Sequence, residues 1–408
     1  MVFQCLVAVG RHKLLKLSFG LVSQDLYIHS FRQYVHSGSI GQGLYYVCRP
    51  KITESELTWC AKSTHSRLDV RVNSWFHRMS SVTLLTGQEM PVIGLGTWQA
   101  KSDEVEKAVE AALEEGYRHI DTAFNYNNEE AIGRALRRWL DAGKVRREDL
   151  FIVTKLPHIG NRASDVPKYL DTSLKRLQLD YIDLYLIHMP FGLVADSTGE
   201  APAIGEDGKL ILDMDTDHQA VWKAMEEQVD AGKARAIGVS NFNTSQLERL
   251  IANARIPPAN LQVELHAGLR QPELRKFCAN HSIVMTAYSP LGSPGAKEHF
   301  EKKYKYSPKH FPDLLGHPVV QKIANAHDKT PAQVLLRHLV QAGIVVIPKS
   351  ANPKRIKENC KIFDFELDNQ EMEELDTLDQ GEDGRILNFR FFEGVEKHPE
   401  YPFTKTNE

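Results

Sequence analysis

The feature that most constrains the fold of this chain is a repeated alternation of short apolar runs and amphipathic segments after Met79. Eight of these runs are rich in β-branched residues and are bounded by polar residues or glycine, which is typical of strands. The expected strands are Val92–Leu95, His119–Thr122, Leu150–Lys155, Ile182–His188, Ala236–Ser240, Asn260–Leu265, Val284–Tyr288 and Ile344–Lys349. The expected helices between them include Asp103–Glu115, Glu129–Asp141, His218–Ala231 and Ala332–Ala342. The alternation predicts an α/β fold.

The number and length of the units favour one particular α/β architecture. Eight βα units within about 260 residues match a (β/α)8 TIM barrel, formed by residues 80–408. A doubly wound sheet is the rival, but it usually has a GxGxxG phosphate loop after its first strand, and residues 94–96 supply only Gly-Leu-Gly. Several expected helices end in a glycine suited to a helix C-cap. These glycines are Gly116, Gly143, Gly232 and Gly343.

A short hairpin is expected to precede the barrel. Val82–Leu85 and Met90–Ile93 are apolar runs, and Thr86-Gly87 between them is suited to a turn. We expect this hairpin to form an N-terminal cap on the barrel.

Residues 1–79 differ from the rest of the chain. They contain ten Lys and Arg against four Asp and Glu, about +6, so that the remainder carries about −9 of the formal total of −3. No helical or strand period is sustained there, and we expect a basic extension that is disordered or wrongly joined to the coding sequence, with translation starting at Met79. A mitochondrial presequence is the alternative. A secretory signal is not expected, because Arg11, His12, Lys13 and Lys16 interrupt the apolar stretches.

Composition excludes several classes of partner. A formal charge of −3 with 25% charged residues gives no reason to expect nucleic acid or an anionic membrane. No run of 18 apolar residues is present, so no membrane span is expected. The five cysteines show neither CxxC nor metal-ligand spacing, which predicts free thiols in a reducing compartment and no metal site. We therefore expect a cytoplasmic monomer, or a mitochondrial one if residues 1–79 are a presequence.

Polar or aromatic residues end most of the expected strands. In a barrel, the carboxyl ends of all strands meet on one rim, where the active site lies. Each such residue alone has an ordinary structural explanation, such as a helix cap or partly buried packing. Caps do not explain a lysine beside an aspartate, a tyrosine and a histidine on one rim. The residues concerned are Asp121, Lys155, His188, Ser240, Asn241, Tyr288 and Lys349, with Tyr126 one loop after the second strand.

The motifs around these residues resemble those of the aldo-keto reductase family over residues 80–408. Gly-Tyr-Arg-His-Ile-Asp-Thr-Ala at 116–123, followed by Tyr126 and Asn128-Glu129, is similar to the family's second-strand signature. Leu-Tyr-Leu-Ile-His at 184–188 is similar to the fourth. Ile-Gly-Val-Ser-Asn-Phe at 237–242 and Ile-Pro-Lys-Ser at 347–350 resemble the cofactor-binding segments. Separated motifs in the same order make the resemblance specific.

The resemblance implies a catalytic tetrad of Asp121, Tyr126, Lys155 and His188. Tyr126 would be the proton donor in carbonyl reduction. A phenol with an ordinary pKa near ~10 releases its proton poorly at neutral pH, and a nearby ammonium lowers that pKa. Lys155 would supply this charge, Asp121 would keep Lys155 protonated, and a neutral His188 would orient the carbonyl.

The resemblance also implies a nicotinamide cofactor lying across the barrel mouth. Tyr288 would stack on the nicotinamide, and Lys349, Ser350 and Arg355 would bind an adenosine 2′-phosphate, which favours NADPH. The other cofactor contacts implied are Thr97, Asp121, Ser240, Asn241, Gln262, Ser289, Leu291, Glu358 and Asn359.

The expected substrate pocket departs from the family's pattern. Met189 follows His188 where many members have tryptophan, and Leu265-His266-Ala267 replaces Cys-His-Pro. The long loop 192–214 is expected over the mouth, and the C-terminal segment 384–403 is expected to close the pocket. The phenylalanines of that segment favour hydrophobic carbonyl substrates over free sugars, unless they merely dock the segment on the barrel. The expected substrate residues are Trp98, Tyr126, His188, Met189, Phe191 and Leu387.

The sequence thus predicts NADPH-dependent reduction of small aldehydes or ketones to alcohols. A non-catalytic cofactor-binding or structural protein on the same fold is the alternative, although the complete tetrad argues against it. The direction of the reaction in the cell stays open, because the same site can oxidise an alcohol.

Overall fold

The computed structural model describes residues 2–8, 13–22, 25–35, 81–304 and 311–403, and the chain divides into the units Met1–Phe76 and His77–Glu408. In the first unit, β1 (Val2–Ala8), β2 (Lys13–Val22) and β3 (Asp25–Val35) form an antiparallel sheet. The sequence showed no sustained period there. Met79 lies outside the described residues, so the start at Met79 and the wrongly joined extension stay predictions.

The second unit is built on eight parallel strands whose order in the sheet follows the chain. Each strand pairs in register with the next, so every carboxyl end lies on the same rim. The strands are β6 (Leu95–Gly96), β7 (His119–Asp121), β8 (Phe151–Leu156), β9 (Ile182–Ile187), β12 (Ala234–Ser240), β13 (Asn260–Glu264), β14 (Val284–Tyr288) and β15 (Val345–Val346). All eight expected strands are confirmed, with ends shifted by a few residues.

The first strand also pairs with the last, which closes the sheet into a barrel. Parallel bridges join Ile93 to Val346 and Gly96 to Lys349. The N–H of Gly94 donates to the carbonyl of Val346 at 2.9 Å, and the N–H of Val346 donates to the carbonyl of Val92 at 2.8 Å. The predicted (β/α)8 barrel is therefore confirmed, and the doubly wound alternative is wrong.

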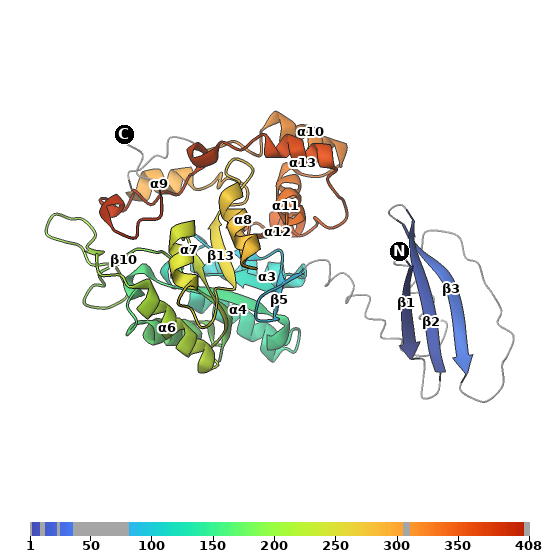
Figure 1. Ribbon diagram of the computed structural model, residues 1–408, viewed down its shortest axis with the longest axis horizontal. Helices are drawn as coiled ribbons and strands as arrows, with labels where there is room; N and C mark the ends of the chain where they lie inside the picture. The colour runs from blue at the N-terminus through green and yellow to red at the C-terminus, as the bar shows by residue number, and fades with distance from the viewer. Residues whose placement is uncertain (1, 9–12, 23–24, 36–80, 305–310, 404–408) are drawn as a thin grey trace. The chain divides into compact units, whose positions relative to one another are not determined.

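Helices alternate with the strands and surround the barrel (Figure 1). The expected helices are found within one residue at each end, and all four predicted glycines have positive φ, between 63° and 96°. The helices are α3 (Ser102–Glu114), α4 (Glu129–Asp141), α5 (Val166–Leu177), α6 (His218–Asp230), α7 (Thr244–Ile251), α8 (Pro272–Asn280), α9 (Lys297–Tyr304), α10 (Pro318–Ala326), α11 (Pro331–Gln341), α12 (Pro353–Asn359) and α13 (Asn369–Asp376).

The alternation of side chains along each strand separates two cores. On β8, Ile152 packs outward with the helices, whereas Phe151 and Val153 belong to the barrel interior. The hairpin of β4 (Ser81–Thr83) and β5 (Glu89–Pro91) places Leu84 and Met90 in the same interior cluster. The expected hairpin is confirmed, and it closes the barrel at the end opposite to the strands' carboxyl ends.

Two further segments lie beyond the βα units. The loop after β9 forms an arm with the short pair β10 (Gly192–Leu193) and β11 (Leu212–Asp213). After α13, the chain continues as the C-terminal segment 384–403, which runs beside α9 in Figure 1. Both segments lie near the rim that carries the polar strand ends.

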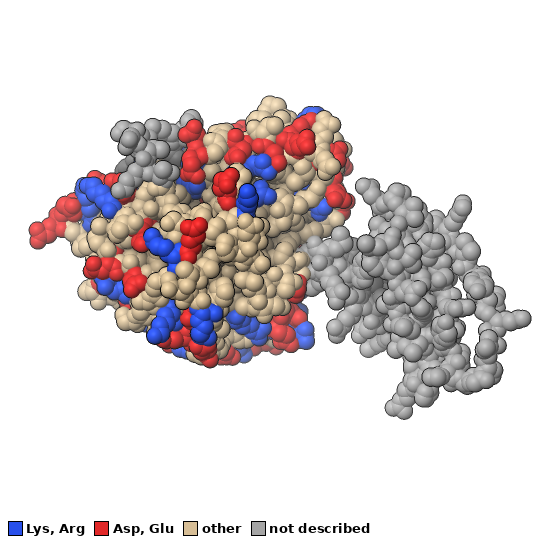
Figure 2. All heavy atoms as spheres, viewed as in Figure 1, with Lys and Arg blue, Asp and Glu red and all other residues tan. Residues whose placement is uncertain are grey.

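The surface of the second unit mixes charges of both signs (Figure 2). Arg134 and Arg138 on α4, for example, both form ion pairs with Glu106 on α3 at 2.7 Å. In the part of the chain that the structure describes, no helix is long and apolar enough to cross a membrane.

Close packing of α4 against α5 generates a stability prediction. A Cβ added to Gly133 would collide with the backbone of Arg176 and Leu177, which a side-chain rotation cannot relieve. We expect Gly133→Ala to lower the free energy of unfolding by about 1–3 kcal/mol despite the better helix propensity of alanine. Urea unfolding followed by circular dichroism measures the change.

Gly295→Ala is the matched control, because a Cβ there would meet no atom within 4 Å. It should change the free energy of unfolding by less than about 0.5 kcal/mol. Equal stability of the two variants would show that α4 and α5 are not packed this closely.

Candidate active site

A buried ion pair lies at the carboxyl end of the barrel. Lys155 follows Phe151 and Val153 on the inward face of β8, and Asp121 is the last residue of β7. The Lys155 ammonium donates to Asp121 Oδ1 at 2.6 Å and to the carbonyl of Thr122 at 2.8 Å. The Lys155 side chain is 0% exposed and that of Asp121 is 2% exposed. A charge buried this deeply is stable only with such a partner.

The second carboxylate oxygen of Asp121 is also occupied. Gln262 on β13 donates from Nε2 to Asp121 Oδ2 at 2.7 Å, and the Thr97 hydroxyl donates to the Asp121 carbonyl at 2.9 Å. Burial lowers the pKa of Lys155, and the charge and hydrogen bond of Asp121 oppose that shift. The aspartate therefore holds the ammonium in place and favours its charged form.

Tyr126 lies beside this pair. It ends the short 3-10 turn Phe124–Tyr126 after β7, and the Lys155 ammonium is 5.3 Å from the centre of its ring. Burial raises the pKa of Tyr126 well above its ordinary value, and the charges of Asp121 and Tyr288 add to the rise. The net direction is opposite to the expected lowering, because burial, the largest effect, disfavours the charged phenolate. The phenol thus keeps its proton at neutral pH.

His188 faces Tyr126 from the neighbouring strand. It comes directly after β9, and its ring makes an edge contact with the Tyr126 ring at 5.7 Å between centroids. Burial lowers the pKa of His188 well below its ordinary value, and the positive charge of Lys155, with that of His158 when it is protonated, lowers it further. The imidazole is therefore neutral at physiological pH, as expected. A proton-holding phenol and a neutral imidazole on one wall suit hydrogen bonding to a carbonyl oxygen.

A cavity of about 880 Å³ extends from these groups across the rim. Asp121, Tyr126 and His188 line it, whereas Lys155 lies beneath its wall. Every cofactor residue expected from the sequence borders this single cavity. They are Thr97, Asp121, Ser240, Asn241, Gln262, Tyr288, Ser289, Leu291, Lys349, Ser350, Arg355, Glu358 and Asn359.

A hydrogen-bond network orients the expected nicotinamide contacts. Tyr288 donates its hydroxyl proton to Asn241 Oδ1 at 2.7 Å. The Asn241 amide donates to the Ser240 hydroxyl at 3.0 Å and to the carbonyl of His188 at 2.9 Å. The network fixes the side chain of Tyr288 at the cavity wall and ties it to the strand end that carries His188.

Two cations mark the far end of the cavity. Lys349 and Arg355 are both exposed there, and neither makes an ion pair with another described residue. Partial burial lowers the pKa of Lys349; Glu104 opposes this shift and the charge of Arg355 adds to it. Two like charges side by side, neither of them in an ion pair with a described carboxylate, suit an anionic ligand.

The substrate end of the cavity is apolar and aromatic. Trp98, Tyr126, His188, Met189 and Leu387 line it as expected. Phe191 does not reach its wall: the side chain is fully buried behind the wall. There it packs against Phe389 and Phe392 at centroid distances of 5.9 and 6.2 Å.

Sequence reasoning missed several residues of this wall. Phe300 of α9 is 1% exposed, borders the cavity and packs 5.8 Å from the Trp98 ring. The signal was present, since Phe300 is the one large apolar residue among the charges of Lys297–Lys302. Asn125 and His158 also border the cavity. They lie in the loops after β7 and β8, where no motif drew attention to them.

A buried carboxylate anchors the start of the C-terminal segment. Glu264, the last residue of β13, accepts hydrogen bonds from the N–H groups of Ile386 at 2.8 Å and Leu387 at 2.7 Å. His266 Nε2 contacts the same carboxylate at 2.9 Å. The C-terminal segment therefore docks beside Leu265-His266-Ala267, where the sequence departs from the family's Cys-His-Pro. Two residues further on, Phe389 has a φ of 60°, which a phenylalanine rarely adopts without support.

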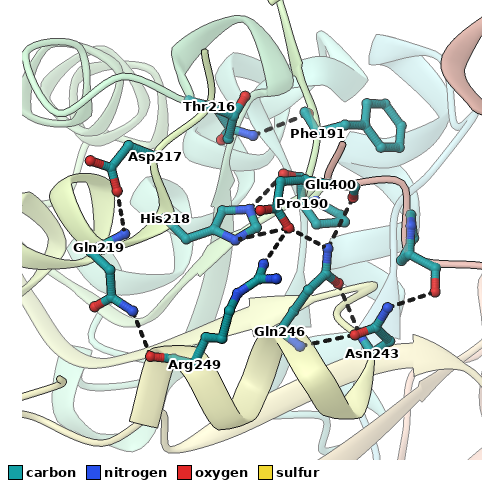
Figure 3. Close-up of polar contacts among 12 residues, drawn as sticks. Pro190, Phe191, Thr216, Asp217, His218, Gln219, Asn243, Gln246, Arg249 and Glu400 are labelled. Carbon is teal, nitrogen blue, oxygen red and sulfur yellow. Dashed lines mark hydrogen bonds and ion pairs between the residues drawn. The ribbon is translucent and has the colours of Figure 1, made fainter. Parts of the chain in front are cut away.

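A second carboxylate anchors the end of the segment (Figure 3). Glu400 Oε2 accepts from Arg249 Nη2 at 2.6 Å and from Gln246 Nε2 at 3.0 Å, both on α7. His218 Nδ1 on α6 lies 3.6 Å from the same oxygen, and Nε2 donates to the carbonyl of Pro190 at 2.6 Å. Burial lowers the pKa of His218 despite the opposing charge of Glu400, so this imidazole is neutral. The segment is therefore held at both ends.

Comparison with known proteins gives consistent matches. The pattern of the Aldo/keto reductase family matches residues 92–380. Aldo-keto reductase family 1 member A1-A of Danio rerio is 41% identical over 332 residues, which cover 79% of this chain and 98% of the relative. Member C1 of the same family from Macaca fuscata fuscata is 43% identical over 328 residues, 79% of this chain and 97% of the relative. The structure of the aldose reductase from Schistosoma japonicum superposes with a TM-score of 0.71 at 41% identity, covering 80% of this chain and 99% of that one.

The Glu400 anchor generates a prediction about the mobility of the C-terminal segment. Glu400→Ala removes the carboxylate that accepts from Gln246 and Arg249 and leaves only the main-chain carbonyl for Gln246, so amide hydrogens of residues 385–403 should exchange roughly tenfold faster. The KM for a carbonyl substrate should rise severalfold, because the wall bearing Leu387 and Phe389 is held less firmly. Hydrogen-exchange mass spectrometry and steady-state kinetics measure the two effects.

Glu393→Ala is the control within the same segment, since Glu393 is exposed and pairs only with exposed Lys209 among the contacts described. It should leave both exchange and KM within about twofold of the original protein. Unchanged exchange in Glu400→Ala would show that other contacts hold the segment.

Proposed function

The chain belongs to the aldo/keto reductase family, and from that premise we propose that it reduces hydrophobic aldehydes and ketones with NADPH, using Tyr126 as the proton donor. Members of the family are oxidoreductases that reduce carbonyl groups with a nicotinamide cofactor. The observation that carries the proposal is the buried pair of Lys155 and Asp121 beneath Tyr126 and His188.

The tetrad divides the work of carbonyl reduction. A bound nicotinamide supplies the hydride to the carbonyl carbon. His188, neutral through burial, donates a hydrogen bond to the carbonyl oxygen and orients it. Tyr126 then gives its proton to the oxygen as negative charge develops there, and the nearby ammonium of Lys155 stabilises the phenolate that remains. Asp121 positions Lys155 throughout.

The cavity fits a phosphorylated dinucleotide. Its volume of about 880 Å³ lies in the range of cofactor sites, and it runs from the tetrad to Lys349 and Arg355. Tyr288, held by Asn241, offers an aromatic face at the tetrad end. At the other end, the two cations and the Ser350 hydroxyl suit a 2′-phosphate, whereas NADH would leave the cations without an anion. These features support NADPH.

The walls at the substrate end support an apolar substrate. Trp98, Phe300 and Phe391 form a continuous aromatic surface, with Phe300 at 5.8 Å from Trp98 and 5.1 Å from Phe391. Burial of an apolar substrate against this surface contributes roughly 25 cal/mol for each Å² removed from water. A free sugar would instead lose hydrogen bonds to water on entering this end of the cavity.

Replacing the proton donor should abolish turnover without disturbing the cofactor site. In Tyr126→Phe the ring is retained and only the hydroxyl is lost. We expect kcat for an aromatic aldehyde to fall roughly 10²- to 10⁴-fold. The Kd for NADPH should stay within about twofold, because Tyr126 contacts the reacting end alone. Oxidation of NADPH at 340 nm and quenching of tryptophan fluorescence measure the two quantities.

Tyr185→Phe is the matched control, since Tyr185 is a buried barrel tyrosine outside the cavity wall whose hydroxyl has no hydrogen-bond partner among the described residues. This variant should keep nearly full activity. If Tyr126→Phe reduced the aldehyde at a rate comparable to that of Tyr185→Phe, another group would be the proton donor.

Cofactor selection provides an independent prediction. Arg355→Met removes one of the two cations but leaves the tetrad untouched, so the Kd for NADPH should rise at least tenfold while that for NADH changes less than twofold. Lys354→Met is the control, because the adjacent Lys354 is exposed and does not border the cavity. An equal loss of affinity for both cofactors would contradict recognition of a 2′-phosphate by Arg355.

A further inference from the structure

His158 is a buried imidazole at the cavity wall that the catalytic tetrad does not use. It begins the 3-10 turn His158–Gly160, three residues after Lys155, and its side chain is 8% exposed. Its Nδ1 lies 2.7 Å from the side-chain amide nitrogen of Asn125, the residue before Tyr126. Both Asn125 and His158 border the cavity. Asn125 and His158, which belong to none of the family's motifs, therefore form a polar pair at the end of the cavity expected to hold the substrate.

The contact with Asn125 fixes which nitrogen of His158 carries the proton. The Asn125 amide donates to Nδ1, which must therefore be the unprotonated nitrogen, and the proton lies on Nε2. Burial lowers the pKa of His158 to about 4, so the ring is neutral at physiological pH. Nε2–H has no hydrogen-bond partner among the described residues, and Nε2 is not one of the fully buried polar atoms that lack a partner. This donor consequently opens onto the cavity.

The surroundings of His158 place this donor between the reacting groups and the C-terminal segment. His158 follows β8 and His188 follows β9, which are neighbouring strands of the barrel, and both residues border the cavity. On the other side, the His158 ring is 5.7 Å from the ring of Phe392, which also borders the cavity. A substrate whose carbonyl is held by His188 and Tyr126 would thus extend past Nε2 of His158 on its way to the aromatic wall.

We propose that His158 is a specificity-determining residue that donates a hydrogen bond from Nε2 to a second, uncharged oxygen of the substrate. The preferred substrates are then apolar carbonyl compounds that also carry a hydroxyl or ether oxygen beyond the reacting group. A buried donor left unpaired by a purely hydrocarbon substrate costs binding free energy, which is the basis of the discrimination. The inference rests on the proposed carbonyl reduction at the same site.

The test compares benzaldehydes that differ only in one ring substituent. Each ring position, ortho, meta and para, carries a hydroxymethyl, methoxy or ethyl substituent, so that an oxygen replaces a carbon at nearly constant size. We measure kcat/KM with NADPH for the original protein, His158→Phe and His158→Gln. For each protein we divide kcat/KM for the oxygenated substrate by kcat/KM for the ethyl substrate. Dividing this ratio by the ratio found for His158→Phe cancels the electronic effects of the substituent.

At one ring position or more, the original protein should prefer both the hydroxymethyl and the methoxy substrate about tenfold relative to His158→Phe. His158→Gln, whose amide also donates, should keep part of this preference. Because the pKa of His158 is about 4, the preference should not change between about pH 6 and 8. If the original protein preferred the hydroxymethyl substrates but not the methoxy substrates, the assignment of a neutral Nε2–H donor would be overturned. A preference that decreases with rising pH would overturn it as well.

The alternative is that His158 only braces the loop of Tyr126 through Asn125. His158→Phe and His158→Gln would then lower kcat for every benzaldehyde by the same factor, and equal ratios in all three proteins would overturn the proposal. NADPH quenching of tryptophan fluorescence in both variants reports an intact cofactor site. If the original protein reduces none of the ethyl benzaldehydes or their oxygenated partners, carbonyl reduction itself is contradicted and this inference falls with it.

Discussion

The ion pair between Lys155 and Asp121 is the constraint on which the rest of the site depends. Transferring two charges from water into a barrel interior costs several kcal/mol for each, and the cost is offset only when each charge is fully hydrogen-bonded. Here Asp121 contacts both Lys155 and Gln262, and Lys155 reaches the carbonyl of Thr122. The pair thereby joins β7, β8 and β13 at their carboxyl ends. Tyr126 beside this pair keeps its proton, because burial and the negative charge of Asp121 both raise the pKa of the phenol.

The cavity above this pair is assembled from segments that are far apart in the sequence. The strand ends supply the polar floor, whereas Phe300 on α9 and the phenylalanines of residues 389–392 supply the apolar wall. Glu264 and Glu400 connect that wall to the barrel, one through backbone N–H groups and the other through α7. The reacting groups are thus fixed by the core of the barrel, and the shape of the substrate space is fixed by contacts outside it.

The sequence pattern was sufficient for the barrel, because short β-branched apolar runs alternate with amphipathic segments along the chain and glycines mark the helix ends. The resemblance implied Asp121, Tyr126, Lys155 and His188 as a tetrad, and the structure brings these four side chains together at the carboxyl rim, where their catalytic roles stay a prediction. Phe191 shows the limit of such reasoning: its spacing from His188 indicates the pocket, but the backbone turns there and buries the ring behind the wall. The direction of the Tyr126 pKa was not predictable either, because it depends on how deeply the fold buries the phenol and on how close it brings Asp121 and Tyr288.

His158 and Phe300 were missed for a related reason. Each lies in a connecting loop or an added helix, where the sequence carries no period that tells an inward side chain from an outward one. Only the folded chain shows that Asn125 turns the imidazole toward the cavity, or that α9 presents its one large apolar residue to Trp98.

The two carboxylate anchors give the C-terminal segment the properties of an exchangeable module. From the C-terminal segment, Glu264 accepts hydrogen bonds from the backbone N–H groups of Ile386 and Leu387, which any residue other than proline provides. Glu400 contacts side chains of α7 that take no part in the cavity. The stretch between them can therefore diverge in sequence while its attachment to the barrel and the chemistry beneath it are preserved. A change in that stretch would reshape the apolar wall of the cavity and leave the side chains at the strand ends where they are.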